Sequence, residues 1–310
     1  MQEIIAKVQV ELIEAELSKN CFLRHTNKGD NEIYVVDAFS APNTMREVGR
    51  LREIAFRSAG GGTGLSCDVD EFDTMTPPCR QLIVWNPKDR EIVGGYRYIL
   101  GENIKFDACG LPNIATAHMF NFSKRFLEEL LPVTIELGRS FVTLEYQSTK
   151  LGAKALYALD NLWDGLGALM VEHPQIKYLF GKVTMYPSYS IEGRNMLLYF
   201  LNLYFPDVDK LVTPIIPLET NADIKEMEKI FCGNDFKEDH KALNQHIREL
   251  GYNIPPLINA YMNLSPTMKM FGTAINYEFG NVEESGILVS IADIVEEKKS
   301  RHISSYEKNE

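Results

Sequence analysis

Hydrophobic and polar positions alternate along this chain in two ways. Some stretches repeat apolar residues at helical spacing, and others are short apolar runs bounded by glycine, proline or asparagine, which is typical of strands. The predicted helices cover residues 3–18, 43–58, 123–131, 151–171, 190–203 and 222–249 (as two helices), and a further element whose type stays open covers residues 257–264. The predicted strands cover residues 33–38, 81–85, 91–100, 132–144, 178–185, 212–217, 268–277 and 286–291. This order favours one mixed α/β sheet over a doubly wound parallel sheet.

Three segments outside these elements have a distinctive composition. Asn43 or Thr44 is a suitable cap for the helix over residues 43–58, which ends at a glycine cluster, residues 60–64. This cluster follows a helix and lacks the Lys-Ser/Thr of a phosphate-binding loop, so it predicts a flexible loop that can act as a lid. Residues 296–310 are rich in charge, and we expect a frayed, solvated tail.

Composition narrows the class of protein. Of 310 residues, 45% are hydrophobic and 24% are charged, as in ordinary soluble globular proteins. The longest apolar runs are too short to span a bilayer, and the N-terminus lacks a secretory signal, so we expect a cytoplasmic protein. Peripheral contact with a membrane surface stays open. A net charge of −11 disfavours non-specific binding to nucleic acid.

Cysteine and histidine residues form no recognisable metal or disulfide pattern. The five cysteines are scattered, odd in number and free of C-x-x-C spacing, and the six histidines include no H-E-x-x-H. We therefore expect neither a disulfide framework nor a bound metal.

Residues 132–144 form an apolar, β-prone run that nevertheless contains Glu136 and Arg139. Charges in a buried strand are costly unless they are paired or used chemically. Residues three apart point to opposite faces of a flat strand, but a bulge at Gly138 would bring both onto one surface. Taken alone, the segment fits a structural ion pair and a catalytic pair equally well.

Three further clusters place charges in predicted core positions. Arg52 and Phe56 lie on the helix over residues 43–58, Asp70 and Asp73 follow the glycine cluster, and Arg97 lies inside a strand. Together with Glu136 and Arg139 they form an ordered set.

This ordered set resembles the acyl-homoserine-lactone synthases. That family has R-x-x-x-F, then D-x-[YF]-D, G-x-x-R and E-x-S-R, and the seven residues above match these elements in order. The motif E-L-G-R-S at residues 136–140 resembles the ornithine- and glycine-lipid N-acyltransferases, often labelled hemolysin-like, more closely than it resembles the synthases. Residues 162–166, 178–183 and 255–261 also resemble that group.

Both families belong to the GNAT superfamily, so the resemblance implies a GNAT (acyl-CoA N-acyltransferase) fold with a C-terminal extension. It covers residues 45–200 well and the last hundred residues loosely. On this basis we expect residues 1–210 to form the acyltransferase core with an N-terminal helix. Residues 211–310 would be an extension packed on that core.

The resemblance also implies a co-substrate, an acyl group on phosphopantetheine, with no tightly bound cofactor. The GNAT cofactor loop corresponds to residues 147–152, from Gln147 to Gly152, where Lys150 replaces the usual first glycine. Backbone N–H groups at a helix N-terminus can hold a phosphate of the pantetheine arm. Lys150 either adds direct charge or faces solvent. Backbone N–H groups near Phe141 and Val142 would bind the oxyanion of the reaction.

Amide formation from a thioester requires an acceptor for the amine proton, which Glu136 can provide. Arg97 and Arg139 either bind the amino acid's carboxylate or order the acidic segment, and Arg52, Asp70 and Asp73 either contact substrate or support the site. Tyr189 matches the place where some GNAT enzymes keep an acid for the thiolate; otherwise it is a packed loop tyrosine.

A run of aromatic and leucine residues before the Glu136 strand is either core or the wall of an acyl slot. It comprises Phe120, Phe122, Phe126, Leu127, Leu130 and Leu131.

The resemblance implies transfer of a fatty (3-hydroxy)acyl group from acyl carrier protein to glycine or ornithine, in the synthesis of membrane aminolipids. Coenzyme A is the alternative carrier. Two alternative functions stay open. One is signal synthesis like that of the acyl-homoserine-lactone synthases, although the tryptophan usual after their first element is missing here. The other is a non-catalytic GNAT module used for binding.

Overall fold

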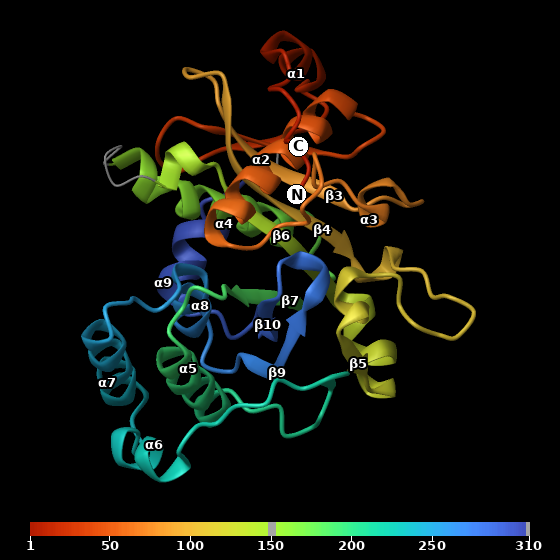
Figure 1. The fold of residues 1–310 in the computed structure, drawn as a ribbon. Helices are drawn as coiled ribbons and strands as arrows, with labels where there is room; N and C mark the ends of the chain where they lie inside the picture. The colour runs from red at the N-terminus through yellow and green to blue at the C-terminus, as the bar shows by residue number, and fades with distance from the viewer. Residues whose placement is uncertain (148–152, 308–310) are drawn as a thin grey trace.

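An eight-stranded sheet organises the chain, of which a computed structural model describes residues 1–147 and 153–307 (Figure 1). The strand order is β1-β2-β3-β4-β6-β7-β10-β9, and neighbours are antiparallel except β6 and β7. These strands are Phe22–His25 (β1), Glu32–Val36 (β2), Arg80–Asn86 (β3), Glu91–Leu100 (β4), Thr134–Val142 (β6), Tyr178–Met185 (β7), Lys269–Asn276 (β9) and Val282–Ser290 (β10). A separate pair consists of Phe120–Phe122 (β5) and Val212–Pro214 (β8). The predicted mixed α/β sheet is confirmed.

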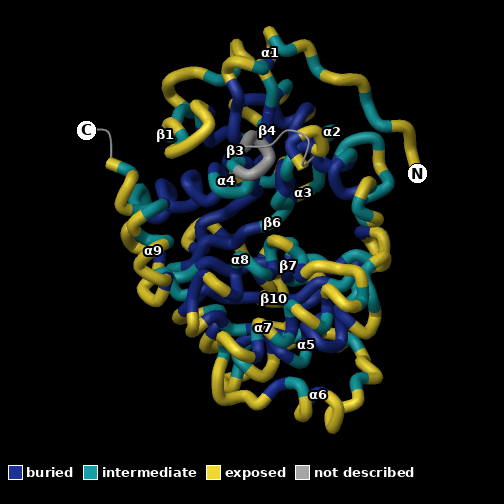
Figure 2. The backbone as a smooth tube through the Cα atoms, turned by 90° about the vertical axis from the view of Figure 1, so that its left-hand side faces the viewer, coloured by how far each residue is buried: buried dark blue, intermediate teal, exposed yellow. Residues whose placement is uncertain are grey.

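Helices cover both faces of the sheet. They are Val10–Glu16 (α1), Pro42–Ala59 (α2), Glu71–Thr74 (α3), Ala153–Glu172 (α4), Ile191–Tyr204 (α5), Ile224–Ile230 (α6), Phe236–Glu249 (α7), Pro256–Met262 (α8) and Glu296–Lys298 (α9). Alternate residues of β3 show how the faces divide: Ile83 packs with α2, whereas Leu82 packs with α4. Both side chains are fully buried, and Figure 2 shows that the central strands are buried along most of their length.

The parallel pair β6 and β7 stays together over only part of its length. Pairing runs from Thr134 opposite Tyr178 to Leu137 opposite Gly181. Beyond that point β6 pairs only with β4, and β7 pairs only with β10. The sheet therefore splits between β6 and β7, and the polar backbone groups along this edge of β6 face an opening.

A bulge in β6 lies beside this split. Gly95 faces Phe141 and Arg97 faces Gly138, so two residues of β6, Arg139 and Ser140, stand opposite one residue of β4. The predicted bulge is confirmed, but the residue with left-handed backbone (φ 47°) is Arg139 rather than the neighbouring glycine. Since the bulge adds one residue, Arg139 comes to lie on the same face of the sheet as Glu136.

The C-terminal hundred residues complete the main sheet. In β10, the pairing with β7 runs from Glu283 opposite Met185 to Ser290 opposite Tyr178, and β9 follows as the outer strand. The division at residue 210 stays a prediction. Residues 211–310 share the central sheet with the preceding part of the chain, which the sequence pattern did not indicate.

The two ends of the chain differ from their predictions. The first helix spans only Val10–Glu16. The backbone N–H groups of Gln2 and Ile5 instead donate to carbonyls of the glycine-rich loop that follows α2, residues 60–66. The tail is not frayed over its described part, since His302 is buried and pairs with Asp164 at 2.7 Å. The tail also packs closely on Gly167 of α4. A Cβ at this position would lie only 2.0 Å from the His302 carbonyl oxygen.

Other local predictions were adjusted by tertiary contacts. Helix α2 begins at Pro42, and the Glu16 carboxylate, not Asn43 or Thr44, accepts hydrogen bonds from its first free N–H groups. Residues 123–131 contain a five-residue π-turn instead of a regular helix.

The glycine-rich loop is attached to α2. Its Thr63 and Gly64 backbone N–H groups both donate to the fully buried Glu53 carboxylate, at 3.1 and 2.8 Å. These contacts favour an anchored loop over the flexible lid that the sequence predicts.

The helices of the fold belong to residues 1–147 and 153–307. None of their helices combines the length and the apolar character that crossing a bilayer requires.

Replacement of Gly181 tests how tightly β7 must approach β6 before the split. A Cβ at this position would lie 2.5 Å from the Leu137 carbonyl oxygen, so we expect Gly181→Ala to reduce the free energy of unfolding by about 2 kcal/mol. Urea denaturation measures the change. Gly138→Ala is the matched control, because its Cβ would meet nothing closer than 3.9 Å. Equal stability of the two variants would contradict this account.

Candidate active site

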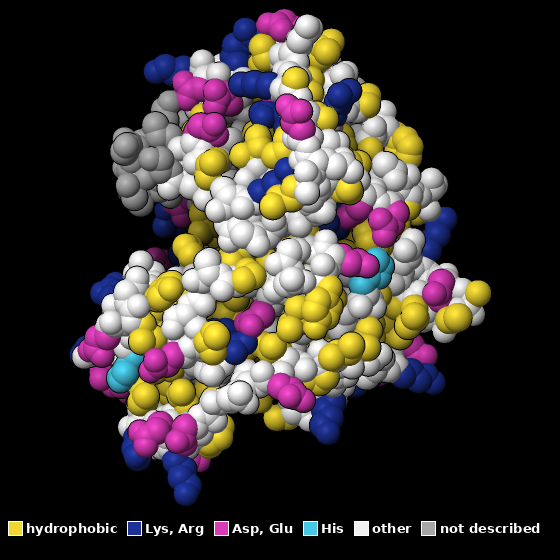
Figure 3. Space-filling view, viewed as in Figure 1, with side chains coloured by type: hydrophobic (Ala, Val, Ile, Leu, Met, Phe, Trp, Pro, Cys, Tyr) yellow, Lys and Arg dark blue, Asp and Glu magenta, His cyan; other side chains and the backbone are white. Residues whose placement is uncertain are grey.

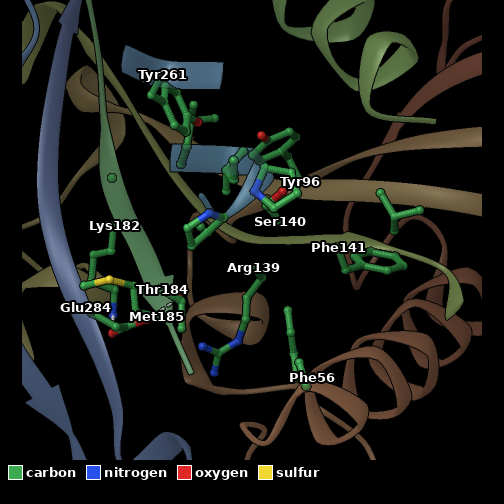
Figure 4. A pocket seen from close by; sticks show the side chains of 18 of the residues that line it. Phe56, Tyr96, Arg139, Ser140, Phe141, Lys182, Thr184, Met185, Tyr261 and Glu284 are labelled. Atoms are coloured by element: carbon green, nitrogen blue, oxygen red, sulfur yellow. Dashed lines mark hydrogen bonds and ion pairs between the residues drawn. The ribbon is translucent and has the colours of Figure 1, made fainter. Parts of the chain in front are cut away.

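A cavity of about 1140 Å³ lies where β6 and β7 separate (Figure 4). Its walls come from β4, β6, β7 and β10, from α2 and α4, and from residues 252–261 that lead into and form α8. The segment over residues 255–261, one of those that carry the family resemblance, therefore contributes to this cavity.

The cavity extends to both faces of the split sheet, and its two halves differ in chemistry. The strand registers place one set of charged side chains on the α2 face: Arg97, Glu136, Arg139, Lys182 and Glu284. We call this the charged half. The opposite face, toward α4 and α8, carries mostly apolar side chains and is the apolar half. Its apolar members include Leu137, Leu159, Leu179, Met185, Leu257, Ile287 and Val289.

Glu136 is the central carboxylate of the charged half. Its side chain is only 3% exposed. Burial raises its pKa above the ordinary value, although the nearby charges of Arg97 and Lys182 and the polar groups of Thr116 oppose the rise. A carboxylate with a raised pKa is a stronger base than an ordinary one, so at the wall of a cavity it is suited to accept a proton from a substrate.

A lysine and a second glutamate face the same half. Lys182 Nζ lies 2.6 Å from Glu284 Oε2, and Asn276 also donates to this carboxylate at 2.9 Å. Burial alone would raise the pKa of Glu284, but Lys182 and its other partners lower it below the ordinary value. Lys182 thus stabilises the ionised form of Glu284, whereas burial disfavours the ionised form of Glu136.

Behind the cavity wall lies a network of three arginines and three aspartates. Arg52, fully buried, pairs with Asp73 at 3.3 Å, and Arg97 pairs with Asp70 at 2.5 Å. Arg139 pairs with Asp68 at 3.0 Å and with Asp70 at 3.4 Å.

The network is also connected to the short helix α3 through Asp70. The Asp70 carboxylate caps α3 by accepting from two of its backbone N–H groups. Burial would raise the pKa of Asp70, but Arg97 and the other arginines lower it to about 2.

The predicted substrate-binding residues separate into two groups. Phe56, Arg97 and Arg139 line the cavity. Arg52 and Asp73 are fully buried within the network and, like Asp70, are absent from the described cavity lining. Their direct contact with substrate stays a prediction, and their position favours the supporting role.

The backbone of β6 beside the cavity fits part of the predicted oxyanion site. The Thr143 N–H donates to Val93 of β4 at 2.8 Å, and strand alternation therefore turns the Val142 N–H away from β4, toward the split. The Val142 carbonyl on the same side accepts from the Gln147 side chain at 2.7 Å. The backbone groups of Phe141 face β4 by the same rule. The predicted cofactor residues Lys150 and Gly152 lie outside the described residues.

Tyr189 lines the cavity, but its hydroxyl already has a partner. It donates to the Asn253 carbonyl at 3.0 Å, and burial, with Tyr252 nearby, raises its pKa to about 12. Donation of a proton to a leaving thiolate, as the resemblance implies, stays a prediction that this arrangement does not favour.

The aromatic and leucine run is part of the core. Its members pack with one another or with Phe180 and Phe271, and none belongs to the described cavity lining. Of the two interpretations, the structure supports core packing.

The sequence analysis missed several cavity residues: Tyr96, Ser140, Lys182, Tyr261 and Glu284. Two carried a usable signal, since Lys182 is a charge inside a predicted strand, as Glu136 is, and Glu284 lies just before one. Ser140 and Tyr261 lie in segments that carry the family resemblance, but an uncharged hydroxyl in a predicted element does not by itself indicate a site.

Comparisons with known proteins identify similar sequences along nearly the whole chain. Residues 51–156 match a family model described as an acetyltransferase (GNAT) domain. A glycine N(alpha)-acyltransferase of Phocaeicola vulgatus is 63% identical over 308 residues, covering 99% of this chain and 94% of the relative. One of Bacteroides thetaiotaomicron is 62% identical over 306 residues, covering 99% and 91%.

Two solved structures show lower similarity. FeeM, an N-acyl amino acid synthase from uncultured soil microbes, matches with TM-score 0.40 and 10% identity, covering 90% of this chain and 98% of that one. The AHL synthase LasI matches with TM-score 0.30 and 13% identity, covering 51% and 74%.

Asp70 provides a test of the network's charge. Its lowered pKa means that it stabilises the fold fully above about pH 4 and that this contribution is lost as the pH falls toward 2. Asp70→Asn keeps a good helix cap, so we expect a loss of about 2 kcal/mol at pH 7 that shrinks between pH 4 and pH 3. Urea denaturation across this range measures both. Asp30→Asn, at an exposed aspartate, should change little, and a pH-independent loss at Asp70 would exclude an effect of its charge.

Proposed function

The chain belongs to the same family as these glycine N(alpha)-acyltransferases and is an acyltransferase, and we propose that it joins a fatty acyl group to the amine of glycine. The donor is an acyl thioester of phosphopantetheine and the product is an N-acylglycine. The observation that carries this proposal is the position of Glu136, a buried carboxylate with a raised pKa at the wall of the cavity beside the split between β6 and β7.

The charged half supplies what the reaction requires. The glycine ammonium first loses a proton, directly or through water, to Glu136. The neutral nitrogen then attacks the thioester carbonyl, so that a C–N bond forms and the C–S bond breaks, and the proton that the acylated nitrogen loses passes to the leaving thiolate. The Val142 N–H, which faces the split, is placed to stabilise the oxyanion formed on the way.

Lys182 is the cation best placed for the carboxylate of glycine. Arg97 and Arg139 each pair with two aspartates of the network, whereas Lys182 pairs with the single carboxylate of Glu284. Lys182 and Glu136 point to the same face of the sheet and line the same cavity. An α-amino acid carries its amine and its carboxylate on one carbon, so both ends can bind here together.

The apolar half suits the donor's hydrocarbon chain. The whole cavity, at about 1140 Å³, is slightly larger than the usual range for ligand pockets. We propose acyl carrier protein as the carrier and a 3-hydroxyacyl chain as the group transferred, with coenzyme A as the competing carrier. On the face in Figure 3, Lys and Arg side chains are interspersed with Asp and Glu and do not form one basic patch, so that face provides no strong attraction for an acidic carrier.

A substrate panel tests the proposal. The purified protein is incubated with a fatty acyl thioester of either carrier and with glycine, ornithine or S-adenosylmethionine, and products are identified by mass spectrometry. N-acylglycine together with free carrier thiol supports the proposal. Predominant acylation of ornithine, lactone formation from S-adenosylmethionine, or no turnover of any thioester would each overturn it.

Glu136→Gln tests the proton acceptor. Glu136 must be deprotonated to accept a proton, so kcat at saturating glycine should fall as the pH is lowered. Because the pKa of Glu136 is raised, this fall should occur at a higher pH than the pKa of an ordinary carboxylate. The glutamine variant should lose this acidic limb and 10²- to 10⁴-fold of kcat. Stopped-flow or discontinuous assays over pH 5–9 measure the profile. A variant with the wild-type limb would rule out this role.

Lys182→Gln tests carboxylate binding. We expect KM for glycine to rise at least tenfold, because a charge-assisted contact is lost, while the rate with glycinamide, which lacks the carboxylate, changes little. Lys182→Arg should restore part of the preference for glycine. Lys177→Gln, at an exposed lysine just before β7, is the matched control. An equal loss with glycine and glycinamide would indicate a structural role instead.

A further inference from the structure

Three hydroxyl groups interrupt the apolar half of the cavity. We propose that the hydroxyls of Tyr96, Ser140 and Tyr261 form a site that binds an oxygen on carbon 3 of the acyl chain. This inference rests on the proposed function and assigns to particular residues the selection among fatty acyl donors.

The strongest evidence is the state of Tyr96. This side chain is 3% exposed and lines the cavity, yet its hydroxyl makes no hydrogen bond of normal length and angle with the described residues. A buried hydroxyl without a partner is destabilising and uncommon in native proteins. A ligand that brings an oxygen into the cavity would supply the missing partner.

The other two hydroxyls come from separate elements. Ser140 is the second residue of the β6 bulge, opposite Tyr96 of β4, and Tyr261 comes from α8. In Figure 4 the three side chains lie close together at one end of the cavity, away from Arg139, Lys182 and Glu284. Burial raises the pKa of Tyr96, and the hydroxyls of Ser140 and Tyr261 lie near enough to oppose this rise by weak hydrogen bonding.

The chemistry of this end fits a neutral oxygen. The charged half already provides groups for the ammonium and the carboxylate of glycine. The three hydroxyls carry no charge, can donate or accept, and are surrounded by aliphatic side chains such as Leu257 and Ile287. A plain alkyl chain would leave the Tyr96 hydroxyl unpaired, whereas a hydroxyl on the chain would satisfy it.

The position along the strand selects the first carbons of the chain. In the proposed reaction the Val142 N–H faces the thioester carbonyl. Ser140 is two residues earlier in β6, so their Cα atoms are about 7 Å apart along the strand. Side chains reaching from this point meet carbons close to the thioester and not the far end of a long chain. Carbon 3 is the position at which fatty acyl thioesters commonly carry an oxygen, because chain elongation passes through it.

The test compares two donors of equal length. The wild-type protein and Tyr96→Phe are assayed with glycine and with the 3-hydroxypalmitoyl and palmitoyl thioesters of one carrier, and the ratio of the two kcat/KM values is measured. We expect the wild-type protein to favour the 3-hydroxy donor at least tenfold, and the variant to lose about tenfold of that ratio. Ser140→Ala and Tyr261→Phe should each reduce the ratio as well.

Tyr98→Phe is the matched control. Tyr98 lies two residues along β4 on the same face, is 1% exposed and also has an unpaired hydroxyl, but it is not part of the described cavity lining. This variant should keep the wild-type ratio.

Two results would overturn the inference. One is a wild-type protein that does not distinguish the two donors. The other is a Tyr96→Phe variant that loses activity with both donors equally, which would assign the hydroxyl to the pantetheine arm or to the fold. Failure of the proposed function is a separate result, since neither donor would then yield N-acylglycine in the wild-type protein.

Discussion

The end of the pairing between β6 and β7 determines how this molecule is built. After Leu137 and Gly181 the two strands no longer share hydrogen bonds, because β6 stays with β4 while β7 stays with β10. A sheet cannot split in its centre without leaving backbone groups unpaired, and such groups are costly unless something binds them. The split therefore creates both the cavity and a line of polar backbone atoms for a ligand.

The bulge at Arg139 and Ser140 gives this opening its chemistry. Without the additional residue, Glu136 and Arg139 would lie on opposite faces of the sheet. With it, Arg139 joins the buried network around Asp68 and Asp70, and Glu136 stays at the cavity wall among fewer compensating charges. The arginines of the network lower the pKa of Asp70, whereas burial raises the pKa of Glu136. Similar residue types thus have different properties because their surroundings differ.

The division of the cavity by the sheet separates two kinds of recognition. Side chains of alternate residues point to opposite faces of a strand, so one opening between β6 and β7 connects a charged half with an apolar half. A molecule with a charged head and a hydrocarbon tail is the kind of product that such a division fits. The three hydroxyls of Tyr96, Ser140 and Tyr261 add a neutral polar site within the apolar half.

The sequence by itself determined most of the secondary structure and identified Glu136 and Arg139 as charges inside a strand. Strand and helix periodicity is local, and a charge inside an apolar run is visible without coordinates. Only the tertiary structure decided that Lys182 and Glu284 face Glu136, that the last two strands complete the central sheet, and that the tail packs on α4. These facts depend on strand order and register, which bring together residues more than a hundred positions apart. A local pattern carries no record of which distant strand will lie beside it.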